Sequence, residues 1–152
     1  MGSSPGKIRE KYPADLPLRH NILSYQLLCS KQEIDKRRFG IAVQNALMYE
    51  GSDGSFIFTV PKTPEEMYDE ATQQANCLAS YVDRVIEGEC IILFMRDKRT
   101  PNLSFVTAEI VNGKINQAKL ARNAEPAATV RLALEKWVER CNSTVTVVDA
   151  IA

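Results

Sequence analysis

Histidine is the scarcest chemically active residue in this chain of 152 residues, where His20 is the single example. Histidine is the commonest metal ligand and the side chain used most often in general acid–base catalysis. The four cysteines do not replace it as metal ligands, because no two of them have the Cys-x-x-Cys spacing of a zinc site. They are Cys29, Cys77, Cys90 and Cys141. We therefore expect no metal and no cofactor, and we interpret the cysteines as reduced thiols of a cytoplasmic protein.

The chain also lacks an excess of charge of either sign. Lysine plus arginine number 19, and aspartate plus glutamate number 19, so the formal net charge is zero. Proteins that bind duplex DNA usually carry a clear basic excess. The balance disfavours general DNA binding, and nucleic acid remains an alternative partner only through local basic clusters.

A long apolar run is missing as well. A membrane-spanning helix needs about 18 consecutive apolar residues, and the longest run here, Cys90–Met95, is far shorter. This run predicts a buried strand. The sequence therefore predicts no association with a membrane.

The length is that of one domain, because a chain of this size can bury a core without a metal or a disulfide. The start, Met-Gly-Ser-Ser-Pro-Gly, resembles a flexible leader or the scar of a cloning tag. We therefore set residues 1–6 aside and expect residues 7–152 to form a single domain. Within it we expect a helical N-terminal part at 7–50, beginning with a proline-rich arm, and an α+β core at 55–141.

Two helices are predicted before the core. The spacing of apolar residues predicts a short helix at 18–29. Ser30 and Glu33 have the spacing of a capping box, which predicts that a second helix begins there and continues to about Tyr49.

The clearest helix start in the core is the sequence Thr63-Pro64-Glu65-Glu66. Threonine can accept a hydrogen bond from a backbone N–H, proline suits the first helical position, and glutamate completes the capping box. An apolar stripe continues from Met67 to Val85 at intervals of three and four. We expect this helix to weaken near Asn76 and to end at Gly88.

β-Branched and aromatic residues predict strands at 56–60, 90–96, 105–111 and 114–120. A cluster of turn residues at 51–54 precedes the first strand, and Asn112-Gly113 predicts a tight hairpin between the last two. A helix at 126–140 and an edge strand at 144–148 follow. The fold class predicted is α+β: a mainly antiparallel sheet of about four strands with helices packed on one face, preceded by an N-terminal helical segment.

Residues 61–123 also carry a series of short motifs. They are Pro61-Lys62-Thr63, Cys77, Tyr81, Arg84-Val85, Gly88-Glu89, Arg96, Thr107-x-Glu109, Asn112-Gly113, Gln117 and Asn123. The series resembles the PcfJ-like family, which is known chiefly from conjugative plasmids, phages and other mobile elements of bacteria. The resemblance covers most of the chain, from about Lys7 to Cys141.

This resemblance implies a mobile-element protein without implying a reaction, because the family has no settled activity. Asn76 stands where the family motif has histidine, Ala79 replaces a glycine, and Leu120-Ala121-Arg122 lacks the glycine that precedes the final asparagine. We expect a non-catalytic interaction module that binds a protein or nucleoprotein partner. An enzyme of unknown reaction and a direct nucleic-acid binder are the alternatives.

The candidate catalytic residues of the enzyme alternative are Cys77, Tyr81 and Glu109. A cysteine nucleophile needs a nearby base to make its thiolate, and Asn76 cannot take up a proton. Adjacent helical residues also point about 100° apart, which makes a neighbour a poor base. We therefore interpret Cys77 as a semi-buried packing residue rather than as a nucleophile.

A second set of polar residues is expected to share one face of the sheet. Thr107 and Glu109 alternate along one strand, and Gln117 can lie opposite them across the hairpin. Together with the arginines they could line a pocket for an anionic ligand, and the alternative is a solvated sheet face with cross-strand Arg–Glu pairs. The candidate ligand-binding residues are Arg84, Arg96, Thr107, Gln117 and Asn123.

Two short basic clusters are the candidate nucleic-acid contacts. They are Lys36-Arg37-Arg38, in the second predicted helix, and Lys98-Arg99, in the turn after the central strand. A run of three basic residues on a helix is more often a solvated face than a nucleic-acid site, so we rank direct nucleic-acid binding below the other hypotheses.

Overall fold

The computed structural model describes the backbone of residues 18–151 and the side chains of residues 22–144. Its contacts divide the chain into two compact units, Met1–Arg37 and Arg38–Ala152. The predicted leader at 1–6, the proline-rich arm before the first helix and the side chain of His20 lie outside the described residues.

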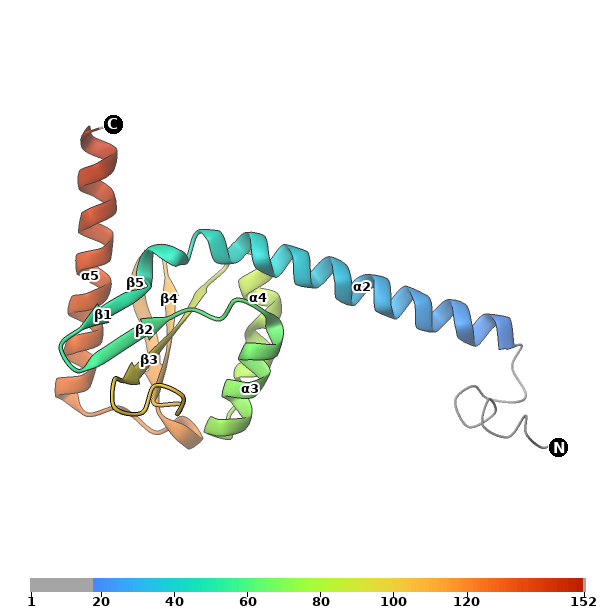
Figure 1. Ribbon diagram of the computed structural model, residues 1–152, viewed down its shortest axis with the longest axis horizontal. Helices are drawn as coiled ribbons and strands as arrows, with labels where there is room; N and C mark the ends of the chain where they lie inside the picture. Colours follow the sequence, from blue (N-terminus) through green and yellow to red (C-terminus); the bar gives the residue numbers. More distant parts are fainter. Residues whose placement is uncertain (1–17, 152) are drawn as a thin grey trace. The chain divides into compact units, whose positions relative to one another are not determined.

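The second unit is built on one five-stranded antiparallel sheet (Figure 1). Its strands lie in the order in which they follow in the chain: β1 (Gly51–Asp53), β2 (Phe56–Thr59), β3 (Ile91–Asp97), β4 (Val106–Val111) and β5 (Lys114–Lys119). The α+β class and the mainly antiparallel sheet are confirmed. The hairpin between β4 and β5 turns at Asn112 and Gly113. Their φ angles of 52° and 78° are both positive, as this type of tight turn requires, and asparagine followed by glycine is the pair that adopts them most readily.

The sheet has five strands, whereas the sequence predicted about four. The additional strand is β1. Residues 51–54 are rich in glycine, and for that reason the sequence predicted only a turn there. Gly51 has a packing reason to be glycine, because a Cβ atom there would lie 2.7 Å from the ring of Trp137. The indole therefore sits directly against the backbone of this edge strand.

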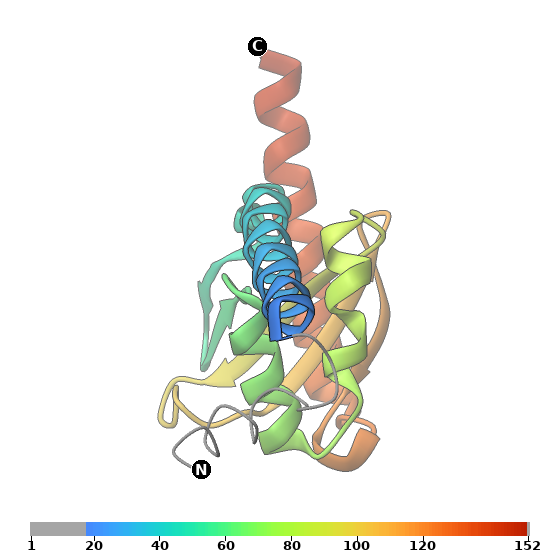
Figure 2. The ribbon, with the colours of Figure 1, turned by 90° about the vertical axis from the view of Figure 1, so that its right-hand side faces the viewer.

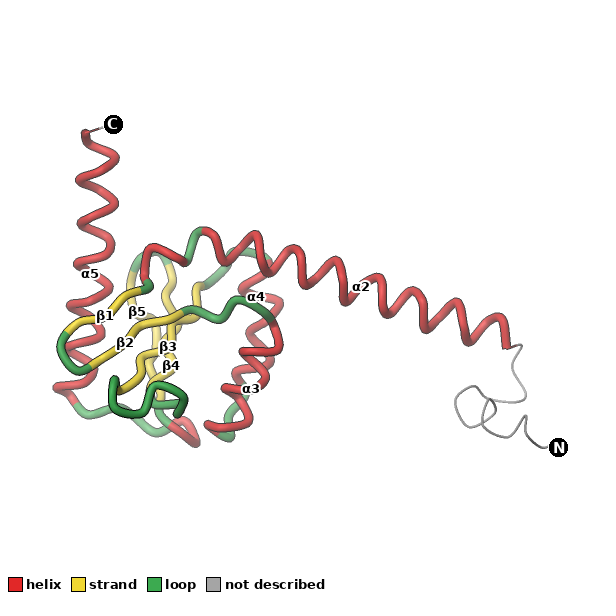
Figure 3. Tube along the Cα trace, viewed as in Figure 1, coloured by secondary structure: helices red, strands yellow, loops and turns green. Residues whose placement is uncertain are grey.

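The N-terminal helical segment is one helix and not two. Helix α2 (Leu18–Gln44) continues through Ser30 without interruption, as the tube in Figure 3 shows. The prediction of a new start at Ser30 was wrong because no glycine or proline near that position ends the preceding helix, and a capping residue alone does not break one. A 3₁₀ turn at Leu47–Tyr49 then leads into β1.

Helix α3 (Pro64–Gln74) begins where the sequence predicted a helix start. Thr63 is the N-cap, its hydroxyl accepts from the backbone N–H of Glu66, and Pro64 occupies the first helical position. The expected weakening near Asn76 is also present. Ala75 adopts a left-handed conformation with φ of 50° and ends α3, and a 3₁₀ turn at Leu78–Tyr81 follows.

The second half of this predicted helix is α4 (Val82–Ile86), and Gly88 with φ of 76° turns the chain toward β3. At the other end of the sheet, helix α5 (Ala128–Ile151) includes the residues for which we predicted an edge strand at 144–148. That prediction was wrong. The β-branched residues there favour a strand, but no helix-breaking residue separates them from the preceding turns, so the helix continues.

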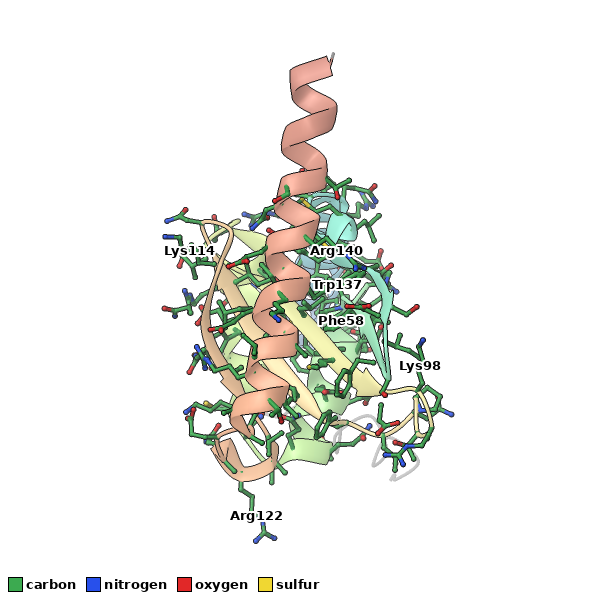
Figure 4. All side chains as sticks on the ribbon, turned by 90° about the vertical axis from the view of Figure 1, so that its left-hand side faces the viewer. Phe58, Lys98, Lys114, Arg122, Trp137 and Arg140 are labelled. Carbon is green, nitrogen blue, oxygen red and sulfur yellow. The ribbon has the colours of Figure 1, made fainter. Side chains whose placement is uncertain are left out.

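Helices cover both faces of the sheet, whereas the sequence analysis placed them on one. Successive strand residues point to opposite faces. Met95 pairs with Phe58, whose ring stacks on Trp137 of α5 at 4.6 Å between centroids. Arg96, the next residue of β3, pairs with Glu70 of α3 instead. Accordingly, α3 and α4 lie in front of the strands in Figure 2, and α5 lies in front of them in Figure 4.

The two-sided cover explains the near-continuous apolar sequence of β3. Leu93 and Met95 are fully buried, and Ile92 and Phe94 on the other face are almost as inaccessible. The largest fully buried side chains of the described residues are Phe39, Phe58, Met67, Leu93, Met95, Ile110, Leu134, Gln74, Glu70, Val60 and Val106. Two polar residues stand in this list, and they lead to the site.

Replacing Leu93 with alanine should lower the free energy of unfolding by about 2–5 kcal/mol, because truncating a fully buried leucine leaves a cavity in a packed interior. Urea unfolding followed by circular dichroism measures the change. Leu132→Ala is the matched control, since Leu132 on α5 is half exposed and should change stability by less than about 0.5 kcal/mol. Equal losses for the two variants would contradict a central, doubly covered β3.

Candidate functional site

A layer of polar side chains lies between the sheet and the segment formed by α3 and α4. Among the described residues the buried polar side chains are Glu70, Gln74, Thr107 and Glu109. Burying such groups is unfavourable unless each one is hydrogen-bonded or paired with an opposite charge. Two connected networks and a separate set of hydrogen bonds meet that requirement.

The first network is centred on Glu70, which is 1% exposed on the inner side of α3. Its carboxylate forms an ion pair with Arg96 of β3 and accepts hydrogen bonds from Ser104 Oγ at 2.8 Å and Thr107 Oγ1 at 3.3 Å. Arg96 also donates to the carbonyl of Pro101 at 3.2 Å. One buried carboxylate thus ties α3 to β3, β4 and the loop between those strands.

The end of α3 carries a separate set of hydrogen bonds. Gln74 Nε2 donates to the carbonyl of Phe105 at 3.1 Å, and Asn76 Nδ2 donates to Gln74 Oε1 at 2.9 Å. Asn76 Oδ1 accepts from the backbone N–H of Leu78 at 3.0 Å. The amide that replaces the motif histidine therefore donates on one side and accepts on the other, and it fixes the break between α3 and α4.

The second network is centred on Glu109 of β4, whose side chain is 2% exposed. Oε1 accepts from Asn116 Nδ2 at 2.8 Å and from Gln117 Nε2 at 3.1 Å. Gln117, which pairs with Glu109 across the hairpin, also donates to the hydroxyl of Tyr81 at 2.6 Å. The network links β4 and β5 to the 3₁₀ turn that follows α3.

Arg84 of α4 supplies the charge opposite Glu109. Its Nη1 lies 2.6 Å from Glu109 Oε2, and its guanidinium lies 5.1 Å from the centre of the Tyr81 ring. This close contact pairs the buried carboxylate with the opposite charge. Desolvation acts to lower the pKa of Arg84, but the Glu109 carboxylate outweighs it and raises the pKa above its usual range.

These residues line a pocket of about 70 Å³ on the face of the sheet covered by α3 and α4. Its walls come from the turn after α3, from β3, β4 and β5, and from the loop after β5. The lining residues are Asn76, Cys77, Leu78, Tyr81, Ile92, Thr107, Ala108, Glu109, Gln117, Lys119 and Asn123.

Asn123 reaches the pocket through an unusual turn. Arg122 and Asn123 both have left-handed backbones, with φ of 58° and 61°, and the turn closes with a 2.7 Å hydrogen bond from the N–H of Leu120 to the carbonyl of Ala124. Asparagine tolerates this conformation better than most residues. The Arg122 side chain points away from the sheet in Figure 4.

The pocket gathers most of the candidate catalytic and ligand-binding residues that the sequence had suggested. Those that line it are Cys77, Tyr81, Thr107, Glu109, Gln117 and Asn123. Arg84 contacts it through Glu109, whereas Arg96 belongs to the Glu70 network and does not line it. The alternative of a solvated sheet face does not describe this region, because Thr107 and Glu109 are buried.

Cys77 is exposed, so its interpretation as a semi-buried packing residue was wrong. The prediction assumed a continuous helix facing the core. The left-handed residue Ala75 breaks that helix. Cys77 is therefore the N-cap residue of the following 3₁₀ turn and does not face the core. Its carbonyl accepts from Ser80 Oγ at 2.7 Å, and its side chain lines the pocket.

The two basic clusters are partly engaged in ion pairs. Arg38 Nη2 lies 2.9 Å from Glu87, and Arg99 contacts Asp97 at 2.8 Å through its guanidinium. Arg99 holds the pKa of Asp97 down at about 2 through a side-chain and a backbone hydrogen bond. Lys36 and Arg37 belong to the first compact unit, and Lys98 lies in the turn after β3.

Sequence reasoning missed Glu70, Gln74 and Asn76 as parts of the site. Glu70 and Gln74 fall at helical spacing beside the apolar residues Met67 and Ala71, so they sit on the buried face of α3. Two polar residues interleaved with an inward-facing apolar stripe were the signal that could have found them.

Cys90 is 5% exposed, and its thiol interacts with the Glu109 carboxylate. Burial raises the pKa of its thiol from 9.0 to about 11, and the Glu109 carboxylate acts in the same direction against the opposing effect of Arg84. A thiol with a raised pKa is protonated at neutral pH and is a poor nucleophile. Cys90 is therefore a structural neighbour of the pocket.

Within the described residues, no cluster of three histidine, cysteine, aspartate or glutamate side chains has the arrangement needed to hold a metal ion. None of the helices in the same part of the chain combines the length and the apolar character that crossing a membrane requires.

The fold and the site define an α+β unit whose antiparallel sheet carries a pocket with both polar and apolar walls beneath a broken helix. The family model of the PcfJ-like protein matches residues 4–134, and the chain belongs to that family. It is also 27% identical over 133 residues to a protein of Listeria innocua described as "Uncharacterized protein Lin1253/Lin1744". That match covers 86% of this chain and 29% of the relative, so the chain spans less than a third of the relative's length. No solved structure matches it.

The raised pKa of Cys90 predicts a pH dependence of stability. Between the unfolded value near 9 and the folded value near 11, the folded state holds the thiol proton more tightly, so stability falls as pH rises through this window. The loss should be on the order of 2 kcal/mol. Urea unfolding at pH 8 to 11 should show a steeper decline for the parent chain than for Cys90→Val, and identical declines would contradict the assignment.

Proposed function

We propose that the chain is a non-catalytic interaction module of a bacterial mobile genetic element. In this proposal it acts in the cytoplasm and binds a protein or nucleoprotein partner through the pocket beside Glu109. Membership of the PcfJ-like family and the resemblance of its motifs to proteins of plasmids and phages support the mobile-element setting.

The size of the pocket is the observation that carries the binding proposal. At about 70 Å³ it is well below the roughly 300–1,000 Å³ of pockets that enclose a drug-sized ligand or a cofactor. It exceeds the roughly 10–15 Å³ that a cavity needs in order to hold one water molecule. A pocket of this size fits the end of one side chain offered by a larger partner.

The polar groups indicate what such a side chain would present. Glu109 contributes a carboxylate to the lining, and Arg84 Nη1 lies 2.6 Å from its Oε2. A second carboxylate beside it would bring two like charges together, which is unfavourable. The pocket therefore favours an amide, hydroxyl or guanidinium over a carboxylate.

An enzyme is the second candidate function, because Cys77, Tyr81 and Glu109 line the same pocket. Against it, Asn76 makes structural hydrogen bonds on both sides of its amide and cannot act as a base. Glu109 is occupied by Arg84, Asn116 and Gln117. Direct nucleic-acid binding through the basic clusters has less support, because Arg38 and Arg99 are already paired with carboxylates.

A selection from a random peptide library tests the binding proposal. Each selected peptide is sequenced, synthesised with a fluorophore and titrated by fluorescence anisotropy against the parent chain and two variants. Asn123→Gly removes a pocket side chain while keeping a backbone that tolerates the φ of 61°. Asn102→Gly makes the same change in an exposed loop.

Asn123→Gly should weaken the selected peptides by roughly tenfold, the scale of one lost hydrogen bond, whereas Asn102→Gly should leave affinity unchanged. Peptides that bind both variants and the parent equally well would contradict binding at the pocket. Turnover that is abolished by Cys77→Ala while peptide affinity is kept would favour the enzyme instead.

A further inference from the structure

Tyr81 brings to the pocket a hydroxyl that still has a hydrogen bond to donate. Tyr81 and Gln117 both line the pocket, and the phenol oxygen accepts from Gln117 Nε2 at 2.6 Å. Accepting this bond uses a lone pair of the oxygen and leaves its own proton free. Within residues 22–144, whose side chains the structure describes, no group accepts that proton in a hydrogen bond. The hydroxyl is therefore a donor available to a ligand.

The direction of the bond between Gln117 and Tyr81 is set by Glu109. Gln117 Nε2 also donates to Glu109 Oε1 at 3.1 Å, and a carboxylate that is paired with Arg84 can only accept. The amide nitrogen of Gln117 must therefore face Glu109, and its second N–H is the one that reaches Tyr81. The tyrosine oxygen is thereby held as the acceptor in this bond, so the tyrosine proton turns elsewhere.

The same arrangement leaves the amide oxygen of Gln117 without a donor. Oε1 accepts no hydrogen bond from the side chains or backbone of the described part of the chain. Two neighbouring residues of the pocket thus offer one donor, the hydroxyl of Tyr81, and one acceptor, Oε1 of Gln117. A ligand group that both accepts and donates would use them together.

A carboxamide meets this requirement best among the polar ends of side chains. Its carbonyl oxygen accepts while its NH₂ group donates, and it carries no charge. A carboxylate could accept from Tyr81, but it would lie beside the carboxylate of Glu109. An ammonium or a guanidinium has no acceptor and would leave the tyrosine proton unmet. A hydroxyl would have to serve both residues with a single oxygen.

The apolar part of the wall suits the stem of such a side chain. Leu78, Ile92 and Ala108 line the pocket beside the polar groups. Asparagine and glutamine carry one and two methylene groups before the carboxamide, and these can pack on the apolar side chains. Burying methylene groups in this way is favourable, because it removes apolar surface from water.

We propose that Tyr81 determines the specificity of the pocket, and that the group bound there is the carboxamide of a glutamine or asparagine side chain of the partner. In this proposal Tyr81 donates to the carbonyl oxygen of the ligand, and Gln117 holds Tyr81 in that role. The proposal rests on the proposed function, because it names the group that the partner inserts into the pocket.

The sequences of the peptides selected on the parent chain test the chemical class. They should share glutamine or asparagine at one position. Synthetic peptides with methionine or glutamate at that position should bind roughly tenfold more weakly, or worse, because methionine lacks the donor and acceptor and glutamate adds a charge. Peptides that share another residue, or that share none, would overturn the proposal.

Tyr81→Phe tests the hydroxyl itself. It should weaken the glutamine or asparagine peptide by roughly tenfold and leave the matching methionine peptide unchanged, because only the carboxamide accepts from the hydroxyl. Tyr68→Phe is the matched control, since it removes the same hydroxyl from a side chain of α3 that is 45% exposed and lies outside the pocket. An equal effect of Tyr81→Phe on both peptides would show a purely structural role and would overturn the proposal.

Asn123→Gly separates this outcome from a failure of the proposed function. If Asn123→Gly weakens the peptides but Tyr81→Phe does not distinguish the carboxamide from methionine, the pocket binds a partner and the role given to Tyr81 is wrong. If neither variant changes binding, or if no peptide is recovered, the proposed function fails and this proposal fails with it.

Discussion

The buried ion pair between Glu70 and Arg96 is the interaction on which the arrangement of the pocket depends. A carboxylate that is 1% exposed is strongly unfavourable alone, and here it has an arginine and two hydroxyl donors. Because its partners come from β3, β4 and the intervening loop, satisfying this one group sets how α3 lies on the sheet.

The break after α3 has hydrogen bonds of its own. Gln74 donates to the carbonyl of Phe105, and Asn76 bonds both to Gln74 and to the backbone of Leu78. With these groups held, Ala75 takes the left-handed conformation that ends the helix. The chain then turns so that Tyr81 reaches Gln117 and Arg84 reaches Glu109. The pocket is the space left beneath that turn.

The extent to which this could be predicted from sequence differs between the fold and the site. The N-cap at Thr63, the Asn112-Gly113 hairpin and the stop at Gly88 are local signals, and each is confirmed. The edge strand β1 was missed because it depends on tertiary packing, and the continuation of α5 was missed because the β-branched residues at 144–148 favour a strand although no residue there ends the helix. Glycine at position 51 is explained by a tryptophan 86 positions later, and nothing local ends α5 at Arg140.

The site was predicted in part, for a similar reason. Alternation along β4 and pairing across the hairpin placed Thr107, Glu109 and Gln117 on one face. Arg96 was assigned to the same pocket because the carboxylate that engages it, Glu70, was hidden among the apolar residues of α3. The exposure of Cys77 could not be foreseen either, because it depends on a helix break fixed by long-range hydrogen bonds.

A double-mutant cycle on Glu70 and Arg96 tests this account most directly. Glu70→Gln, Arg96→Met and the double variant are unfolded in urea, and the coupling free energy is taken from the four stabilities. We expect a coupling of about 1–3 kcal/mol. The stability losses of the two single variants should add up to more than the loss of the double variant, because either change alone leaves a buried group without its partner. Additive effects would mean that the pair does not hold α3 in place, and would contradict the account.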